Sequence, residues 1–211
     1  MTTRAVIFDF WGTLVDQGVR SPIKQLKNAL QVNLPFSEYV VRMERAMMTE
    51  NFSSLRDAFK AVFREFSVPD DEQVLDQLVG MWNKNWMLAQ PYPDVNEVLK
   101  KLKGNHKLIL VSNTDNCSIE NVLDKFNLRD LFDKIYLSYQ VHMIKTDKNF
   151  LKMVLDENNL SPEECVMVGD SIQSDMAAAQ KVGIKGVLID RKNNRDFTPR
   201  IRSLQELEEH L

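Results

Sequence analysis

Polar side chains that could do chemistry follow four apolar segments of this chain. Carboxylates can act as covalent nucleophiles, and they are hard oxygen ligands of the kind that Mg²⁺ prefers. A lysine places positive charge where negative charge develops on a substrate. The candidates are, in chain order, Asp9, Ser112 with Asn113, Lys145, and Asp170 with Asp175. These residues can form one site only if the segments before them bring them together.

The first segment places Asp9. The continuous apolar run Ala5–Phe8 is followed by a Gly12-Thr13 turn, a pattern typical of a buried strand in a parallel sheet. Parallel α/β sheets bind ligands outside the carboxyl ends of their strands. Asp9 therefore lies where chemistry is usually placed. Taken alone, the same residues are equally compatible with a solvated aspartate that ends an ordinary strand.

From Pro91 onward, strand and helix patterns alternate, which favours βαβ units and a parallel sheet with helices on both faces. The first strand belongs with this block, because one strand cannot stand alone. The predicted α/β core therefore comprises residues 1–16 and 91–211. Strands are predicted at residues 107–111, 135–138, 165–168 and 185–189, and helices at 94–103, 118–126, 149–158, 175–182 and 204–211.

Residues 17–90 lack convincing strands and are predicted to form an all-helical insertion after the first strand. Apolar residues recur there at three- and four-residue spacing, as in amphipathic helices. An insertion at this point is well placed to cover the catalytic end of the sheet, with hinges predicted at residues 15–18 and 90–93. The expected helices cover residues 25–30, 39–48, 55–63 and 71–79.

Composition excludes several classes of protein. The chain has 211 residues, of which 44% are hydrophobic and 27% charged, with a net charge of −3. These values are ordinary for a globular protein and unlike those of a nucleic-acid-binding domain, which is usually strongly basic. No stretch approaches the roughly 20 apolar residues of a membrane span, and Arg4 and Asp9 interrupt any signal-peptide core. We therefore expect a cytoplasmic protein without nucleic-acid or membrane partners; its oligomeric state stays open.

Taken in order, the four polar segments resemble the four motifs of the haloacid dehalogenase-like (HAD) hydrolase superfamily. The resemblance covers residues 1–15 and 91–211. It implies a Rossmann-like core and identifies the insertion as that family's helical cap. The activity it implies is Mg²⁺-dependent hydrolysis of a small phosphorylated metabolite through an aspartyl-phosphate. The resemblance does not specify the substrate.

The resemblance also implies a role for each polar residue. Asp9 is expected to attack phosphorus, while Ser112, Asn113 and Lys145 are expected to bind the transferred phosphoryl group. The metal ligands implied are Asp9, the backbone carbonyl of Trp11, Asp170 and Asp175. For Asp175 there is an alternative role, which is to orient Lys145. Two of these residues could have simpler, structural roles: Ser112 could cap the following helix, and Asp170 could merely end a strand. Lys148 is an alternative to Lys145, because Thr146 follows Lys145 where the family usually has proline.

Trp11 departs from the family pattern. Family phosphatases carry a second aspartate two residues after the nucleophile, which protonates the leaving oxygen and then activates water. An indole can do neither, because it is only a hydrogen-bond donor. Three interpretations follow. The protein could be a phosphatase that uses good leaving groups or recruits another residue, or a non-catalytic binder of phosphorylated ligands. It could also be a 2-haloacid dehalogenase, in which case Asp16 and Arg20 become candidate site residues, because an arginine can bind a carboxylate through two hydrogen bonds. The acidic Asp170–Asp175 stretch favours a metal and ranks the phosphatase first.

Further residues have plainer explanations. Gly12 and Thr13 are expected to form the turn out of the sheet, with Thr13 able to hold the loop through its side chain. His142 precedes Lys145 by three residues, yet a loop histidine is the simpler interpretation. Trp82 and Trp86 lie four residues apart on a helix, which is typical of core residues or of a contact between cap and core.

Overall fold

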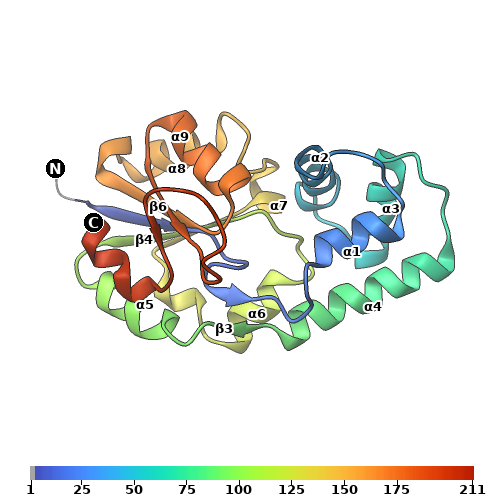
Figure 1. Ribbon diagram of the computed structural model, residues 1–211, viewed down its shortest axis with the longest axis horizontal. Coiled ribbons are helices and arrows are strands. Elements are labelled where there is room, and N and C mark those ends of the chain that lie inside the picture. The colour runs from blue at the N-terminus through green and yellow to red at the C-terminus, as the bar shows by residue number, and fades with distance from the viewer. Residues whose placement is uncertain (1–2) are drawn as a thin grey trace.

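The computed structural model describes residues 3–211, so residues 1 and 2 of the predicted core lie outside the described part (Figure 1). Its centre is a six-stranded sheet in the order β5-β4-β1-β6-β7-β8, with every neighbouring pair parallel. The predicted α/β, Rossmann-like fold with a helical insertion is therefore confirmed. The strands are β1 (Ala5–Phe8), β4 (Lys107–Ser112), β5 (Lys134–Leu137), β6 (Cys165–Gly169), β7 (Lys185–Ile189) and β8 (Arg200–Ile201).

Side chains of β1 alternate between two apolar clusters, one on each face of the sheet. Val6 and Phe8 join the cluster formed with α5 and α6, whereas Ala5 and Ile7 join the one formed with α8 and α9. Because both faces are covered, the strand is apolar throughout instead of alternating. Figure 1 shows these helix pairs on opposite sides of the sheet: α5 (Val95–Lys103), α6 (Ile119–Lys125), α8 (Phe150–Asn158) and α9 (Ala177–Val182).

The insertion forms a helical cap of α1 (Pro22–Ala29), α2 (Phe36–Met48), α3 (Leu55–Glu65) and α4 (Glu72–Leu88) beyond one end of the sheet. It has its own apolar cluster, which includes Tyr39, Phe59 and Trp82. Side chains cap two of its helices: Ser54 accepts a hydrogen bond from the N–H of Asp57, and Asp71 accepts two at the start of α4. The first backbone N–H groups of a helix have no partner within the helix, so their hydrogen bonds to these side-chain oxygens stabilise each helix start.

A short antiparallel ribbon joins the cap to the core. Its strands are β2 (Val15–Asp16) and β3 (Gln90–Pro91), with Val15 opposite Pro91 and Asp16 opposite Gln90. The chain therefore leaves the core and returns to it through two hydrogen-bonded neighbours. These segments coincide with the predicted hinge positions, although the sequence did not indicate that they pair.

Several local features differ from the sequence predictions. The helix expected at residues 175–182 begins as a π-helical turn, Ile172–Met176, and the predicted C-terminal helix is a 3₁₀ segment, Leu204–His210. A short helix, α7 (Ser138–Val141), follows β5 directly. Over residues 3–211, none of the helices combines the length and the apolarity that a membrane crossing requires.

Candidate active site at the carboxyl ends of the strands

Three carboxylates meet where β1 and β6 end. Asp9, Asp170 and Asp175 each offer an oxygen, and these oxygens all lie within 4.8 Å of one another. Asp9 follows β1 and donates its backbone N–H to the carbonyl of Val168 in β6, at 2.9 Å. Adjacent parallel strands thus bring together Asp9 and Asp170, which are far apart in the sequence.

Two glycines make room for this cluster. A Cβ atom at Gly12, whose φ is +78°, would lie 2.7 Å from Asp170 Oδ2. A Cβ atom at Gly169 would lie 2.2 Å from Asp175 Oδ2. Both distances are too short for any side chain, so the two carboxylates rest directly against the backbone. The expected turn at Gly12 therefore also sets how closely Asp170 approaches the loop after β1.

Lys145 connects the nucleophile candidate with the third carboxylate. Its Nζ atom lies 2.5 Å from Asp9 Oδ1 and 2.5 Å from Asp175 Oδ1. Within residues 3–211, Lys145 is the only lysine or arginine in the buried class, whereas Lys148 is exposed. The geometry therefore favours Lys145 over Lys148 despite the missing proline. Burial alone lowers the pKa of Lys145, but the adjacent carboxylates of Asp175 and Asp9 outweigh burial and raise it.

The carboxylate cluster carries more negative charge than its neighbours neutralise. Burial raises the pKa of Asp9, an effect that Lys145 opposes and that Asp175 and Asp170 reinforce. Burial and Asp175 likewise raise the pKa of Asp170, although Arg195 Nη2 lies 3.2 Å from Asp170 Oδ2. Converging carboxylate oxygens are the donor set that Mg²⁺ prefers, and a divalent cation would relieve their mutual repulsion. The residues present therefore fit a hard divalent cation.

Ser112 and Asn113 lie at the end of β4, next to β1. Ser112 is fully buried. The amide of Asn113 is held at both ends: its Oδ1 accepts the backbone N–H of Lys145 at 2.8 Å, and its Nδ2 donates to Glu44 Oε2 at 2.8 Å. Asn113 thus connects the core, the loop that carries Lys145 and helix α2 of the cap.

Trp11 follows Asp9 by two residues, and its indole is turned toward the loop after β4. Its Nε1 donates to Thr114 Oγ1 at 3.3 Å, and its ring packs edge-on against Phe10. Thr13 Oγ1 donates to Asp9 Oδ2 at 3.0 Å. Thr13 therefore contacts the nucleophile candidate directly, besides forming part of the turn. The polar atom of Trp11 is already engaged with Thr114.

Sequence reasoning missed Glu44, the cap residue that reaches this site. Its side chain is buried, and burial raises its pKa to about 7, although Lys145 and the Asn113 hydrogen bond act in the opposite direction. A signal was available: Val40, Glu44 and Met48 follow one another at four-residue spacing, so an acid interrupts an otherwise apolar stripe of α2. Arg195, which contacts Asp170, gave no such signal, because it lies in an irregular loop.

Other candidates have partners outside the carboxylate cluster or are exposed. Asp16 accepts a hydrogen bond from Tyr92 Oη at 3.0 Å beside the ribbon, and Arg20 is exposed. His142 is exposed and bonds through Nδ1 to the carbonyl of Thr49 at 2.8 Å. In the part of the chain that the structure describes, neither Asp16 nor Arg20 forms a hydrogen bond or an ion pair with Asp9, and His142 joins the cap to the core as a loop residue.

Trp82 makes a buried contact between the cap and the core. Its ring packs edge-on against Phe59 inside the cap, while its Nε1 donates to Asp115 Oδ2 of the core at 2.9 Å. The interpretation of Trp82 as a core or cap–core residue is confirmed. Trp86, one turn later, is less buried and bonds Asn83 within α4.

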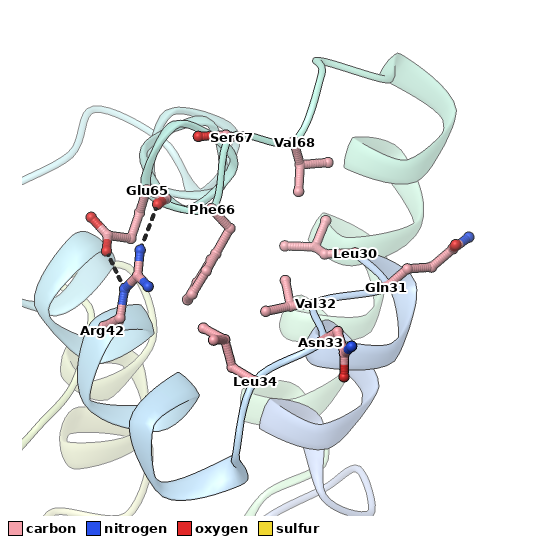
Figure 2. A pocket seen from close by; sticks show the side chains of 10 residues that line it. All are labelled: Leu30, Gln31, Val32, Asn33, Leu34, Arg42, Glu65, Phe66, Ser67 and Val68. Atoms are coloured by element: carbon pink, nitrogen blue, oxygen red, sulfur yellow. Dashed lines mark hydrogen bonds and ion pairs between the residues drawn. The ribbon is translucent and has the colours of Figure 1, made fainter.

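A cavity of about 330 Å³ lies inside the cap instead of at the carboxylates. Figure 2 shows apolar side chains facing this space, with the guanidinium of Arg42 directed toward Glu65. None of the predicted site residues lines the cavity. Its two ionisable side chains are engaged with each other at 2.6 Å. The chemistry-bearing residues are therefore those at the ends of the strands.

Comparison with known proteins agrees with this geometry. A family model described as haloacid dehalogenase-like hydrolase matches residues 6–189. A phosphoglycolate phosphatase from Psychrobacter arcticus is 26% identical over 191 residues, which cover 87% of this chain and 82% of that relative. A HAD phosphatase from Thermococcus onnurineus has a TM-score of 0.63 at 25% identity, with coverage of 99% and 97% of the two chains. A 2-haloacid dehalogenase from Pseudomonas syringae shares the fold, with a TM-score of 0.65, 18% identity and coverage of 99% and 97%.

Proposed function

The chain belongs to the haloacid dehalogenase-like hydrolase family, and from this premise we propose that it is a Mg²⁺-dependent phosphatase acting on a small phosphorylated metabolite. The observation that carries the proposal is the cluster of Asp9, Asp170 and Asp175, whose oxygens converge within 4.8 Å. A phosphatase must bind an anion next to an anionic nucleophile. Three converging carboxylates with one shared lysine are suited to that task only when a cation joins them.

In this mechanism Asp9 is the nucleophile. It attacks phosphorus to form an aspartyl-phosphate, which water then hydrolyses. Thr13 and Lys145, at 3.0 and 2.5 Å, hold the two oxygens of its carboxylate in place. Asp9, Asp170, Asp175 and the backbone carbonyl of Trp11 would hold the cation. When bound, the cation screens the repulsion between Asp9 and the anionic substrate.

The phosphoryl group is bound by residues from β4 and from the loop after α7. The Ser112 hydroxyl and the backbone N–H of Asn113 would donate hydrogen bonds to its oxygens, and Lys145 would offset the charge that spreads over them. The backbone of the Lys145 loop is fixed by its hydrogen bond to Asn113. Positioning of this kind supplies much of the rate of phosphoryl transfer, because the protein has little other covalent work to do.

The cap would cover the site during reaction. We assign residues 1–16 and 91–211 to the catalytic core and residues 17–90 to the cap, with the β2–β3 ribbon as the hinge. Exclusion of water by a closed cap strengthens the electrostatic interactions inside. The cap contacts that support this role come from Glu44 and Trp82, which bind Asn113 and Asp115 of the core.

A substrate screen with and without Mg²⁺ tests the proposal. The purified protein would be assayed on phosphorylated metabolites, an aryl phosphate and 2-haloacids, beside Asp9→Asn. We expect Mg²⁺-dependent release of phosphate that is lost in Asp9→Asn. Haloacid turnover in chelator without phosphatase activity would replace the proposal with a dehalogenase. The absence of any turnover, together with thermal stabilisation by a phosphorylated ligand, would indicate a binding protein.

A further inference from the structure

Trp11 leaves the proposed reaction without its usual proton carrier. Hydrolysis of an alkyl phosphate needs a proton on the departing oxygen, and the second step needs a base for the attacking water. The indole N–H has no acceptor function and already donates to Thr114 Oγ1. Another side chain must therefore move these protons, or only esters with good leaving groups can react.

The other buried acids are committed elsewhere. Among the acidic side chains that the structure describes as buried, Asp9 and Asp175 hold Lys145, and Asp94 holds Arg191. Asp115 accepts from Trp82, Ser118 and the N–H of Cys117. Asp190 accepts the N–H of Arg195. The remaining buried acid is Glu44, which is also the only buried residue of the described cap among its aspartates, glutamates, lysines, arginines and histidines.

Glu44 lies on the side of the site that the departing group must face. In phosphoryl transfer the nucleophile and the leaving oxygen are roughly in line with phosphorus. Asp9 would attack from the edge of the sheet, so the leaving oxygen points away from the sheet toward the cap. Glu44 enters from that side on α2, and Asn113 ties its carboxyl to the loop of Lys145.

On the basis of the proposed phosphatase function, we propose that Glu44 is the general acid and base of the reaction, in place of the aspartate that Trp11 replaces. Protonated Glu44 gives its proton to the alkoxide oxygen as the P–O bond breaks and the Asp9–phosphorus bond forms. Ionised Glu44 then takes a proton from the water that attacks phosphorus. The bond to Asp9 breaks, phosphate leaves, and Glu44 is protonated again.

The electrostatic surroundings of Glu44 suit this role. Burial raises its pKa to about 7, while Lys145 and the Asn113 hydrogen bond lower it and Asp175 raises it. Its helical neighbour Arg45 is half exposed and bonds Asp147, at 2.5 Å. An acid whose pKa lies near the working pH can exist in both protonation states that the two steps need.

The decisive variant is Glu44→Gln, tested on a pair of substrates. Gln keeps the size of the side chain and an oxygen that can accept from Asn113, but it cannot exchange a proton. With Mg²⁺ we expect turnover of an alkyl phosphate to fall by about 10²–10⁴-fold. With p-nitrophenyl phosphate, whose leaving group needs no proton, we expect a burst of one nitrophenol per enzyme followed by slow turnover, because the second step lacks its base.

The matched control is Glu50→Gln, which changes an exposed acid of the same cap and should leave both substrates unaffected. Glu44→Asp keeps a carboxyl and should restore part of the alkyl turnover. Full alkyl turnover by Glu44→Gln, or equal losses on both substrates without a burst in a folded protein, would overturn the assignment. Wild-type protein that hydrolyses no phosphate ester in Mg²⁺ would instead overturn the proposed function.

Discussion

Glu44 of the cap and Asn113 of the core are joined by a buried hydrogen bond, with Glu44 Oε2 2.8 Å from Asn113 Nδ2. Asn113 directly follows Ser112 at the end of β4, and its other amide atom fixes the loop of Lys145. The cap therefore contributes a side chain to the candidate site. Any displacement of α2 must break or stretch this contact.

Replacement of Glu44 should change how stability depends on pH. Its folded pKa of about 7 exceeds that of an exposed glutamate, so the folded state binds an extra proton between the two values. The free energy of unfolding therefore falls as pH rises from about 4.5 to 7, by about 3 kcal/mol for this group. In chelator, Glu44→Gln should unfold at a higher temperature than wild type at pH 8. This advantage should shrink at pH 5; an equal difference at both pH values would contradict the predicted titration.

Mg²⁺ should stabilise the protein through its carboxylate cluster. A ligand at about 100 times its Kd adds about 2.7 kcal/mol to the free energy of unfolding. We expect thermal unfolding of wild type to shift upward with Mg²⁺ and that of Asp170→Asn to shift much less. Asp156→Asn, which changes an exposed acid on α8, serves as the control and should respond like wild type. An undiminished shift in Asp170→Asn would remove Asp170 from the metal site.

Trp82 should stabilise the protein more than Trp86. Phenylalanine at position 82 would leave Asp115 without the indole N–H that now lies 2.9 Å from its Oδ2. Loss of one partner from a buried polar contact costs about 1–3 kcal/mol. Trp86→Phe removes only a partly buried bond to Asn83 within the same helix and should cost less. Urea unfolding of both variants measures this difference; equal losses would count against a special role for the Asp115 contact.

Asp94 joins distant parts of the core, so Asp94→Asn should destabilise it strongly. Its Oδ2 accepts from Arg191, Ser203 and the N–H of Leu204, at 2.7–2.9 Å. Burial alone raises the pKa of Asp94, but these bonds outweigh it and lower the pKa. The stabilisation is therefore present above the unfolded pKa and is lost as pH falls through the lower folded value.

Breaking a buried pair of this kind costs about 3–5 kcal/mol, which denaturant unfolding at pH 7 would measure. Lys101→Gln is the matched control, because it removes an exposed salt bridge to Glu208 that contributes about 0–1 kcal/mol. A cost for Asp94→Asn no greater than that of the control would show that the Arg191 pair contributes little.

The core was predictable because its strands are apolar enough to be recognised one at a time. Ala5–Phe8 and Cys165–Gly169 become neighbours once the strands are parallel, so the convergence of Asp9 with Asp170 follows from where these two strands end. The Lys145 position also followed from order along the chain, although its burial between Asp9 and Asp175 did not. Strand β8 was missed because its two residues are too few to form a recognisable pattern.

The missed parts of the site depend on packing between distant segments. Glu44 reaches the site only because the cap docks against the loop after β4. Arg195 reaches Asp170 from an irregular segment whose conformation leaves no periodic signal. Trp11 was recognised as unusual, yet the engagement of its N–H with Thr114 required coordinates. Residue type could mark these side chains as unusual, but it could not predict which partners they contact.

The β2–β3 ribbon has a consequence for how the two halves of the molecule can move. Val15 pairs with Pro91 and Asp16 with Gln90, so the outgoing and returning segments are coupled to each other. A bend in one segment must be matched by its neighbour, so we expect any relative motion of the cap and the core to be a swing about this ribbon. Such a swing would return α2 to one position on the core, where the carboxyl group of Glu44 meets Asn113.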